Sequence, residues 1–144
     1  MKKKIVLYWA RRDLRCVDNP ALFAAISYSK KENIPFLPIF ILEEYMTRAD
    51  PKVQFGYPSR FFLTKALPLF AKNFSNFTLI QGKAAKTILS LAQYFDVTVF
   101  VNEDVYKDFY TQIHTIREHG VDIKLYTDTL TVSKETKTGG GNLY

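Results

Sequence analysis

The sequence has very little cysteine and, in its first third, no glycine at all. Cys16 is the single cysteine among 144 residues, which excludes an internal disulfide and leads us to expect a reducing, cytoplasmic compartment. The first glycine is Gly56, so no glycine-rich loop can follow the first strand, and this argues against a dinucleotide site. Apolar runs of about 20 residues, the length that spans a bilayer, are also missing, and we expect no membrane contact.

Residue combinations that would indicate catalysis or a metal site are scarce as well. His114 and His119 lie five positions apart with Cys16 far away, which does not match the ligand spacing of a zinc site. No serine–histidine–acid or cysteine–histidine pattern indicates a nucleophile. Gly82 and Lys83 lack the upstream glycine of a phosphate-binding P-loop and predict a turn. The sequence therefore predicts no catalytic residue and no metal ligand.

Apolar, strand-like segments alternate along the chain with segments of helical periodicity. We expect strands at 4–9, 36–42, 77–81, 97–101 and 121–126, and helices at 20–31, 58–74, 84–95 and 105–119. This order predicts an α/β fold: a Rossmann-like three-layer α/β/α domain with a five-stranded parallel sheet over residues 1–128. Residues 43–56 are polar and are expected to be irregular, and residues 129–144 form a polar, glycine-containing tail.

Two details of this pattern can be tested against a structure. Pro38 stands inside the second expected strand and removes a hydrogen-bond donor, so it predicts an edge position or a bulge. The helix expected at 58–74 is predicted to bury an apolar face, made of Phe61, Phe62, Ala66, Leu69 and Phe70.

Side chains suited to binding follow three of the expected strands. Because the carboxyl ends of parallel strands meet at one edge of a sheet, we expect a ligand site there. The candidates are Trp9, Ala10, Arg11, Arg12 and Asp13 after the first strand, Leu42 and Glu43 after the second, and Asn102, Glu103 and Asp104 after the fourth. Arginine forks suit a phosphate or an anionic ring system. The alternative is that these charges pair with one another and bind nothing.

The net charge of +6 belongs to the beginning of the chain. Residues 1–31 carry eight Lys or Arg against two Asp, whereas the remaining residues carry twelve of each sign. A basic region attracts nucleic acid, meets an acidic partner surface, or only keeps the protein soluble.

Residues 8–22 read Tyr-Trp-Ala-Arg-Arg-Asp-Leu-Arg-Cys-Val-Asp-Asn-Pro-Ala-Leu, and this string resembles the N-terminal signature of the DNA photolyase/cryptochrome family. In that signature, a tryptophan-phenylalanine-arginine-arginine-aspartate-leucine-arginine run leads into aspartate-asparagine-proline-alanine-leucine. This chain departs from the signature at Ala10, where phenylalanine is usual, and at Val17, where histidine is common. The resemblance extends over almost the entire chain, but over only the front third or so of a typical family member.

The resemblance implies that this is the domain that holds a light-harvesting antenna chromophore: FMN, a deazaflavin or a folate. The parent protein would be a deoxyribodipyrimidine photolyase, in which FAD in a helical domain repairs pyrimidine dimers in damaged DNA by light-driven electron transfer. Residues 129–144 would then begin the linker to that helical FAD domain, which is absent here. Folate-binding members have a carboxylate shortly after the asparagine that ends the fourth strand, where this sequence has Phe109. That difference argues against folate and leaves a flavin-like antenna, or no antenna, as the open options.

Three alternatives to the photolyase interpretation are compatible with these residues. A cryptochrome-type photoreceptor would use the same domain, and the features that distinguish it lie in the helical domain. A nucleotide-binding module of the universal-stress or electron-transfer-flavoprotein type shares the architecture, but it should carry a glycine-rich phosphate loop. A basic interaction domain that docks a separate partner chain is the third alternative.

Overall fold

The computed structural model describes residues 1–47, 56–104 and 106–128, and within them strands and helices alternate. The strands are β1 (Lys3–Ala10), β2 (Phe36–Leu42), β3 (Thr78–Gln81), β4 (Phe95–Asn102) and β5 (Asp122–Tyr126). The helices are α1 (Pro20–Glu32), α2 (Glu44–Thr47), α3 (Tyr57–Ala71), α4 (Ala84–Tyr94) and α5 (Lys107–Glu118). The tail at 129–144, and with it the expected start of a linker, lies outside the described residues.

The five strands form one parallel sheet in the order β3-β2-β1-β4-β5, which confirms the predicted fold class. The chain builds the sheet outward from β1 to β3 and then returns to the other side of β1 with β4. The strand order therefore reverses between β1 and β4. In open α/β sheets, the loops that leave two strands on either side of such a reversal diverge and leave a crevice for a ligand.

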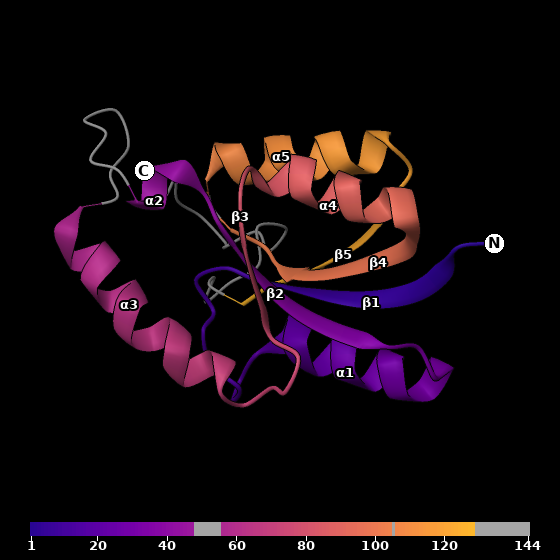
Figure 1. Cartoon of the computed structure of the whole chain (residues 1–144), viewed down its shortest axis with the longest axis horizontal. Coiled ribbons are helices and arrows are strands. Elements are labelled where there is room, and N and C mark those ends of the chain that lie inside the picture. The colour runs from indigo at the N-terminus through magenta and orange to yellow at the C-terminus, as the bar shows by residue number, and fades with distance from the viewer. Residues whose placement is uncertain (48–55, 105, 129–144) are drawn as a thin grey trace, which may run out of the picture.

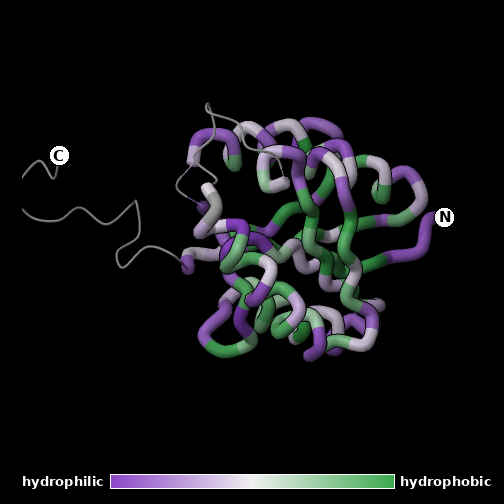
Figure 2. Tube along the Cα trace, turned by 60° about the vertical axis from the view of Figure 1, so that its left-hand side comes forward, coloured by the Kyte–Doolittle hydropathy of each residue, from purple (hydrophilic) through white to green (hydrophobic). Residues whose placement is uncertain are grey.

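Helices cover the sheet on both faces, as the alternation of side chains along β1 requires (Figure 1). Leu7 and Trp9 point into a core completed by α4 and α5, and Val6, Tyr8 and Ala10 point into a core completed by α1 and α3. The hydropathy-coloured trace shows hydrophobic strands in the middle of the molecule and a hydrophilic segment at the N-terminus (Figure 2). Because β1 and β4 lie inside the sheet, most of their residues are buried on both faces.

Three local predictions differ from the structure. Pro38 is neither on an edge strand nor at a bulge: it pairs in register with Tyr8 in the middle of β2. The proline is tolerated because pairing with β3 starts only at Ile39, so one side of β2 is still unpaired at residue 38. Residues 44–47, expected to be irregular, form the short helix α2.

The predicted apolar face of α3 is largely wrong. Phe70 is buried, but Phe61, Phe62 and Leu69 are 52%, 66% and 58% exposed. The face that packs on the sheet instead combines Phe70 with the partly buried Leu63 and Leu67, and Phe74, just past the end of α3, packs against the same core. Apolar residues surround α3 on every side, so helical periodicity could not identify the buried face.

Candidate functional site

A buried network of polar side chains joins the loop after β1 to the end of β4. Asp13, Asn19 and Asn102 are only 4%, 5% and 5% exposed. The Asn102 amide nitrogen donates to Asp13 Oδ2 at 2.5 Å and to Asn19 Oδ1 at 2.8 Å. The Asn102 Oδ1 atom accepts from the backbone N–H of Ala21 at 3.1 Å, in the first turn of α1. Asn102 therefore ties β4, the β1–α1 loop and the start of α1 together.

Tyr8 and Asp13 form the centre of this network. The Tyr8 hydroxyl donates to Asp13 Oδ2 at 2.5 Å and accepts from the Asn19 amide at 2.8 Å. The other oxygen of Asp13 accepts from the backbone N–H of Arg11 at 2.8 Å. Burial, together with the neighbouring Asp13 carboxylate, raises the pKa of the Tyr8 phenol far above its ordinary value. Asp13 therefore accepts from three separate donors and fixes the path of the loop that carries the arginines.

Asn19 caps the N-terminus of α1. Its Oδ1 accepts from the backbone N–H of Leu22 at 3.1 Å, and Pro20 occupies the first turn. The Asn19 amide nitrogen also donates to the carbonyl oxygens of Asp13 and Arg15, at 3.1 and 2.9 Å. The asparagine–proline pair of the signature thus stabilises the start of α1 and the loop before it.

Arg11 is nearly buried and packs against two aromatic rings that also contact each other. Its guanidinium carbon lies 4.9 Å from the Trp9 ring centre and 4.7 Å from that of Phe109. An ion pair of 3.6 Å joins its Nη2 to Asp104 Oδ2. Burial lowers the pKa of Arg11, while Asp104 opposes that shift. The buried Nε of Arg11 has no hydrogen-bond partner among the described residues, so it retains a donor that a ligand acceptor would satisfy.

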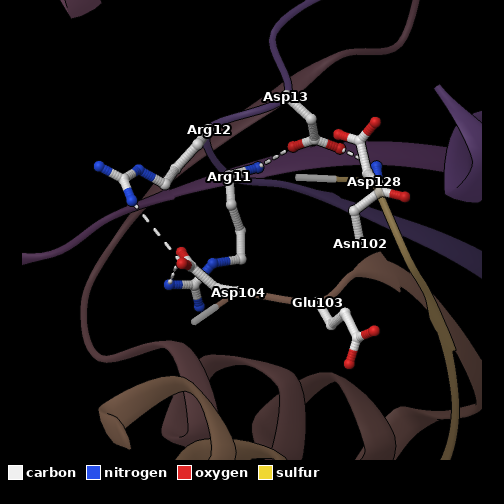
Figure 3. A pocket seen from close by; sticks show the side chains of 7 residues that line it. All are labelled: Arg11, Arg12, Asp13, Asn102, Glu103, Asp104 and Asp128. Atoms are coloured by element: carbon white, nitrogen blue, oxygen red, sulfur yellow. Dashed lines mark hydrogen bonds and ion pairs between the residues drawn. The ribbon is translucent and has the colours of Figure 1, made fainter. Parts of the chain in front are cut away.

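Arg12 also pairs with the Asp104 carboxylate, but its side chain faces the solvent. Its Nη1 is 3.7 Å from Asp104 Oδ1, and 60% of its side chain is exposed. The guanidinium carbon stands 4.9 Å from the ring centre of Tyr106, which is itself 55% exposed. Figure 3 shows both arginines reaching Asp104 from the loop after β1. Arg12 and Tyr106 thus offer a flat cationic and aromatic surface that solvent reaches.

A small pocket lies between the loops after β1 and β4, at the reversal of the strand order. Its lining residues are Arg11, Arg12, Asp13, Asn102, Glu103, Asp104 and Asp128. Glu103 accepts from the Tyr110 hydroxyl at 3.1 Å and from the Thr127 hydroxyl at 2.6 Å. Asp128, the last residue described before the tail, pairs with Arg15. The lining carries four carboxylates against two guanidinium groups.

The remaining predicted site residues lie around this pocket without lining it. Trp9 and Ala10 are buried at the end of β1, and Leu42 is half-buried in the α1/α3 core. Glu43 accepts from the backbone N–H of Ala84 at 2.8 Å, at the start of α4, and from Gln112 at 3.2 Å. Glu43 therefore stabilises the helix start, where a carboxylate is favoured by the helix dipole.

Four residues of this region were not among those predicted from the sequence: Tyr45, Tyr106, Phe109 and Asp128. Burial and the Glu43 carboxylate raise the pKa of the Tyr45 phenol, while Arg11 and Arg12 oppose that shift, which places Tyr45 close to the arginines. Each of the four stands a few residues after a strand or at the start of a helix, where sequence alone gives no side-chain direction. A search for aromatic residues flanking the predicted loops would have found three of them.

The side chains around this pocket can bind a ligand by stacking and by hydrogen bonding. Among the described residues, no cluster of His, Cys, Asp or Glu is arranged to hold a metal ion. No described helix has the length and apolar character needed to cross a bilayer. The site offers a stacked guanidinium, an unsatisfied buried N–H and aromatic rings on two sides, which together suit a flat ligand with hydrogen-bond acceptors.

Comparison with known proteins gives one family match. A family model described as DNA photolyase matches residues 6–144. No curated protein matches the chain. Among solved structures, a protein of the universal stress protein family from Burkholderia pseudomallei is similar at 12% identity and a TM-score of 0.46, over 85% of this chain and 95% of that one.

Proposed function

Because the chain belongs to the DNA photolyase family, we propose that it is the antenna-binding domain of a deoxyribodipyrimidine photolyase. The antenna would be a flavin or deazaflavin chromophore held at the edge of the sheet between β1 and β4. It would absorb light and pass the energy to FAD in a helical domain of the same protein, where cyclobutane dimers in damaged DNA are split.

The exposed Arg12–Tyr106 pair is the observation that carries this proposal. The two planar groups stand 4.9 Å apart and are both more than half exposed, so a conjugated ring system gains stacking area on them. Arg11 lies one residue away with a buried Nε–H that lacks a partner among the described residues. An acceptor atom on the rim of the chromophore would satisfy that donor.

Phe109 supports a flavin-like antenna over a folate. Its ring is 1% exposed and packs against Trp9, with ring centres 6.1 Å apart, and against Arg11. The position at which folate-binding relatives are expected to carry a carboxylate is therefore occupied by an apolar side chain inside the core. The carboxylate-rich lining also disfavours a phosphate inside the pocket, so Arg12 at the rim is the group we expect to meet any phosphate of FMN.

A fluorescence titration tests the antenna site. The purified protein is titrated with FMN, a deazaflavin and a reduced folate, and the affinities are compared with those of Arg12→Gln, Tyr106→Leu and the matched surface variant Lys83→Gln. We expect a flavin or deazaflavin to bind, Arg12→Gln and Tyr106→Leu to weaken it about tenfold, and Lys83→Gln to leave it unchanged. Absence of binding at tens of micromolar, or equal loss in all three variants, would contradict the proposal.

A further inference from the structure

The outward face of α3 is apolar and basic at the same time. Phe61, Phe62 and Leu69 are each more than half exposed, and Lys65 and Lys72 are exposed among them at helical spacing. Figure 1 shows α3 along the outer side of the molecule, with the sheet on its other side. Large apolar side chains gathered on one surface mark a contact site more often than a solvated helix face.

The chain around α3 carries no acidic residue. No Asp or Glu stands between Asp50 and Asp96, although the whole sequence contains 14 of them. Three cations of this stretch, Arg60, Lys65 and Lys72, lie on α3 or at its end, whereas Lys83 and Lys86 lie at α4 on the other face of the sheet. A surface whose own segment supplies cations and no carboxylates has a positive potential, so its partner is expected to be negatively charged.

Charge argues against a symmetric dimer of the chain through this face. A symmetric dimer through this face would bring Lys65 and Lys72 of one copy against the same face of the other, with no carboxylate from α3 to neutralise them. The partner must supply both negative charge and flat or apolar groups to cover the phenylalanine rings.

We propose that the outward face of α3 binds single-stranded nucleic acid without sequence preference. Bases stack on Phe61 and Phe62, and phosphates pair with Lys65 and Lys72. The Lys65 ammonium lies over the Phe61 ring, 5.5 Å from its centre, so a cation and an aromatic ring stand together on this surface. Lys65 and Lys72 are two helical turns apart, about 10 Å along the axis, which suits successive contacts along one strand.

This surface is separate from the pocket between β1 and β4, because none of the pocket's lining residues belongs to α3. Loss of chromophore binding would therefore leave the nucleic-acid proposal standing, and the reverse also holds. Single-stranded DNA and RNA share the phosphates and base rings on which the proposal depends, so both serve as probes.

Fluorescence anisotropy with a labelled 16-mer of thymidine and a labelled 16-mer of uridine tests the proposal. We expect both to bind within a few-fold of each other, and to lose about tenfold in affinity between 50 and 200 mM salt, as engagement of two to three cations requires. Phe61→Ala/Phe62→Ala is expected to weaken binding at least fivefold, since each lost stacking contact alone has an effect of that size. Lys65→Gln/Lys72→Gln is expected to flatten the salt dependence.

Two matched controls distinguish this face from net charge and from general stickiness. Lys30→Gln/Lys31→Gln removes the same charge from the last turn of α1, and Phe23→Ala removes an aromatic ring that is 76% exposed on α1. Both are expected to bind like the unaltered protein, with circular dichroism confirming the fold of every variant. Equal weakening by the controls, absence of binding at 50 mM salt, or binding only to phosphatidylserine vesicles would overturn the proposal.

Discussion

The hydrogen-bonded network around Asp13 and the two arginines that pair with Asp104 are neighbours in sequence and differ in physical character. Tyr8, Asp13, Asn19 and Asn102 satisfy one another's hydrogen bonds away from water. Arg12 shares its carboxylate with Arg11 at 3.7 and 3.6 Å, and most of its side chain faces solvent. A single charged string thus contains residues that hold the loop in place and residues that the loop presents to a ligand.

The largest expected effect is the loss of Asp13. Asp13→Ala leaves the Tyr8 hydroxyl, the Asn102 amide and the Arg11 backbone N–H without their acceptor in a buried environment. Each buried unsatisfied group costs about 1–3 kcal/mol, so we expect the free energy of unfolding to fall by roughly 3–5 kcal/mol. Urea denaturation measures the change. The exposed carboxylate of Asp122 provides the control, and a comparable loss on Asp122→Ala would remove the distinction drawn above.

Tyr8→Phe removes one bond from the same network and is expected to cost less, about 1–2 kcal/mol. The substitution also changes the response to alkali. Because the pKa of Tyr8 is raised in the folded protein above its ordinary value of 10.0, the unfolded chain loses this proton first as pH rises. The contribution of Tyr8 to the free energy of unfolding is therefore fully present below pH 10. It declines above pH 10, by up to about 1.4 kcal/mol for each pH unit.

Urea denaturation of the unaltered protein and of Tyr8→Phe at pH 8, 10 and 11 tests the direction of this pH dependence. We expect the difference in the free energy of unfolding between the unaltered protein and Tyr8→Phe to be smaller at pH 11, because only the unaltered protein loses the contribution of this phenol. A gap that widens with pH would show that the Tyr8 hydroxyl is not protected in the folded state.

The sequence predicted the sheet and the edge on which these two regions meet, because alternation of element types and the parallel order depend on local patterns. It also predicted Arg11, Arg12, Asp13 and Asn102 as neighbours. It did not separate buried from exposed members: Arg11 and Arg12 are adjacent and identical in type, yet their side chains are 16% and 60% exposed. The same limit explains the wrong prediction for the buried face of α3, because helical periodicity could not show which of its apolar sides faces the sheet.

The smallest expected effect on stability belongs to Arg12. Its ion pair with Asp104 is 3.7 Å long and its side chain is 60% exposed, so solvent screens the interaction, and Asp104 keeps Arg11 as a partner. We expect Arg12→Gln to change the free energy of unfolding by less than about 0.5 kcal/mol while it weakens chromophore binding about tenfold. Urea denaturation and a chromophore titration on one preparation of Arg12→Gln measure the two quantities. A stability loss of 2 kcal/mol or more would place Arg12 with Asp13 as a residue that the fold requires.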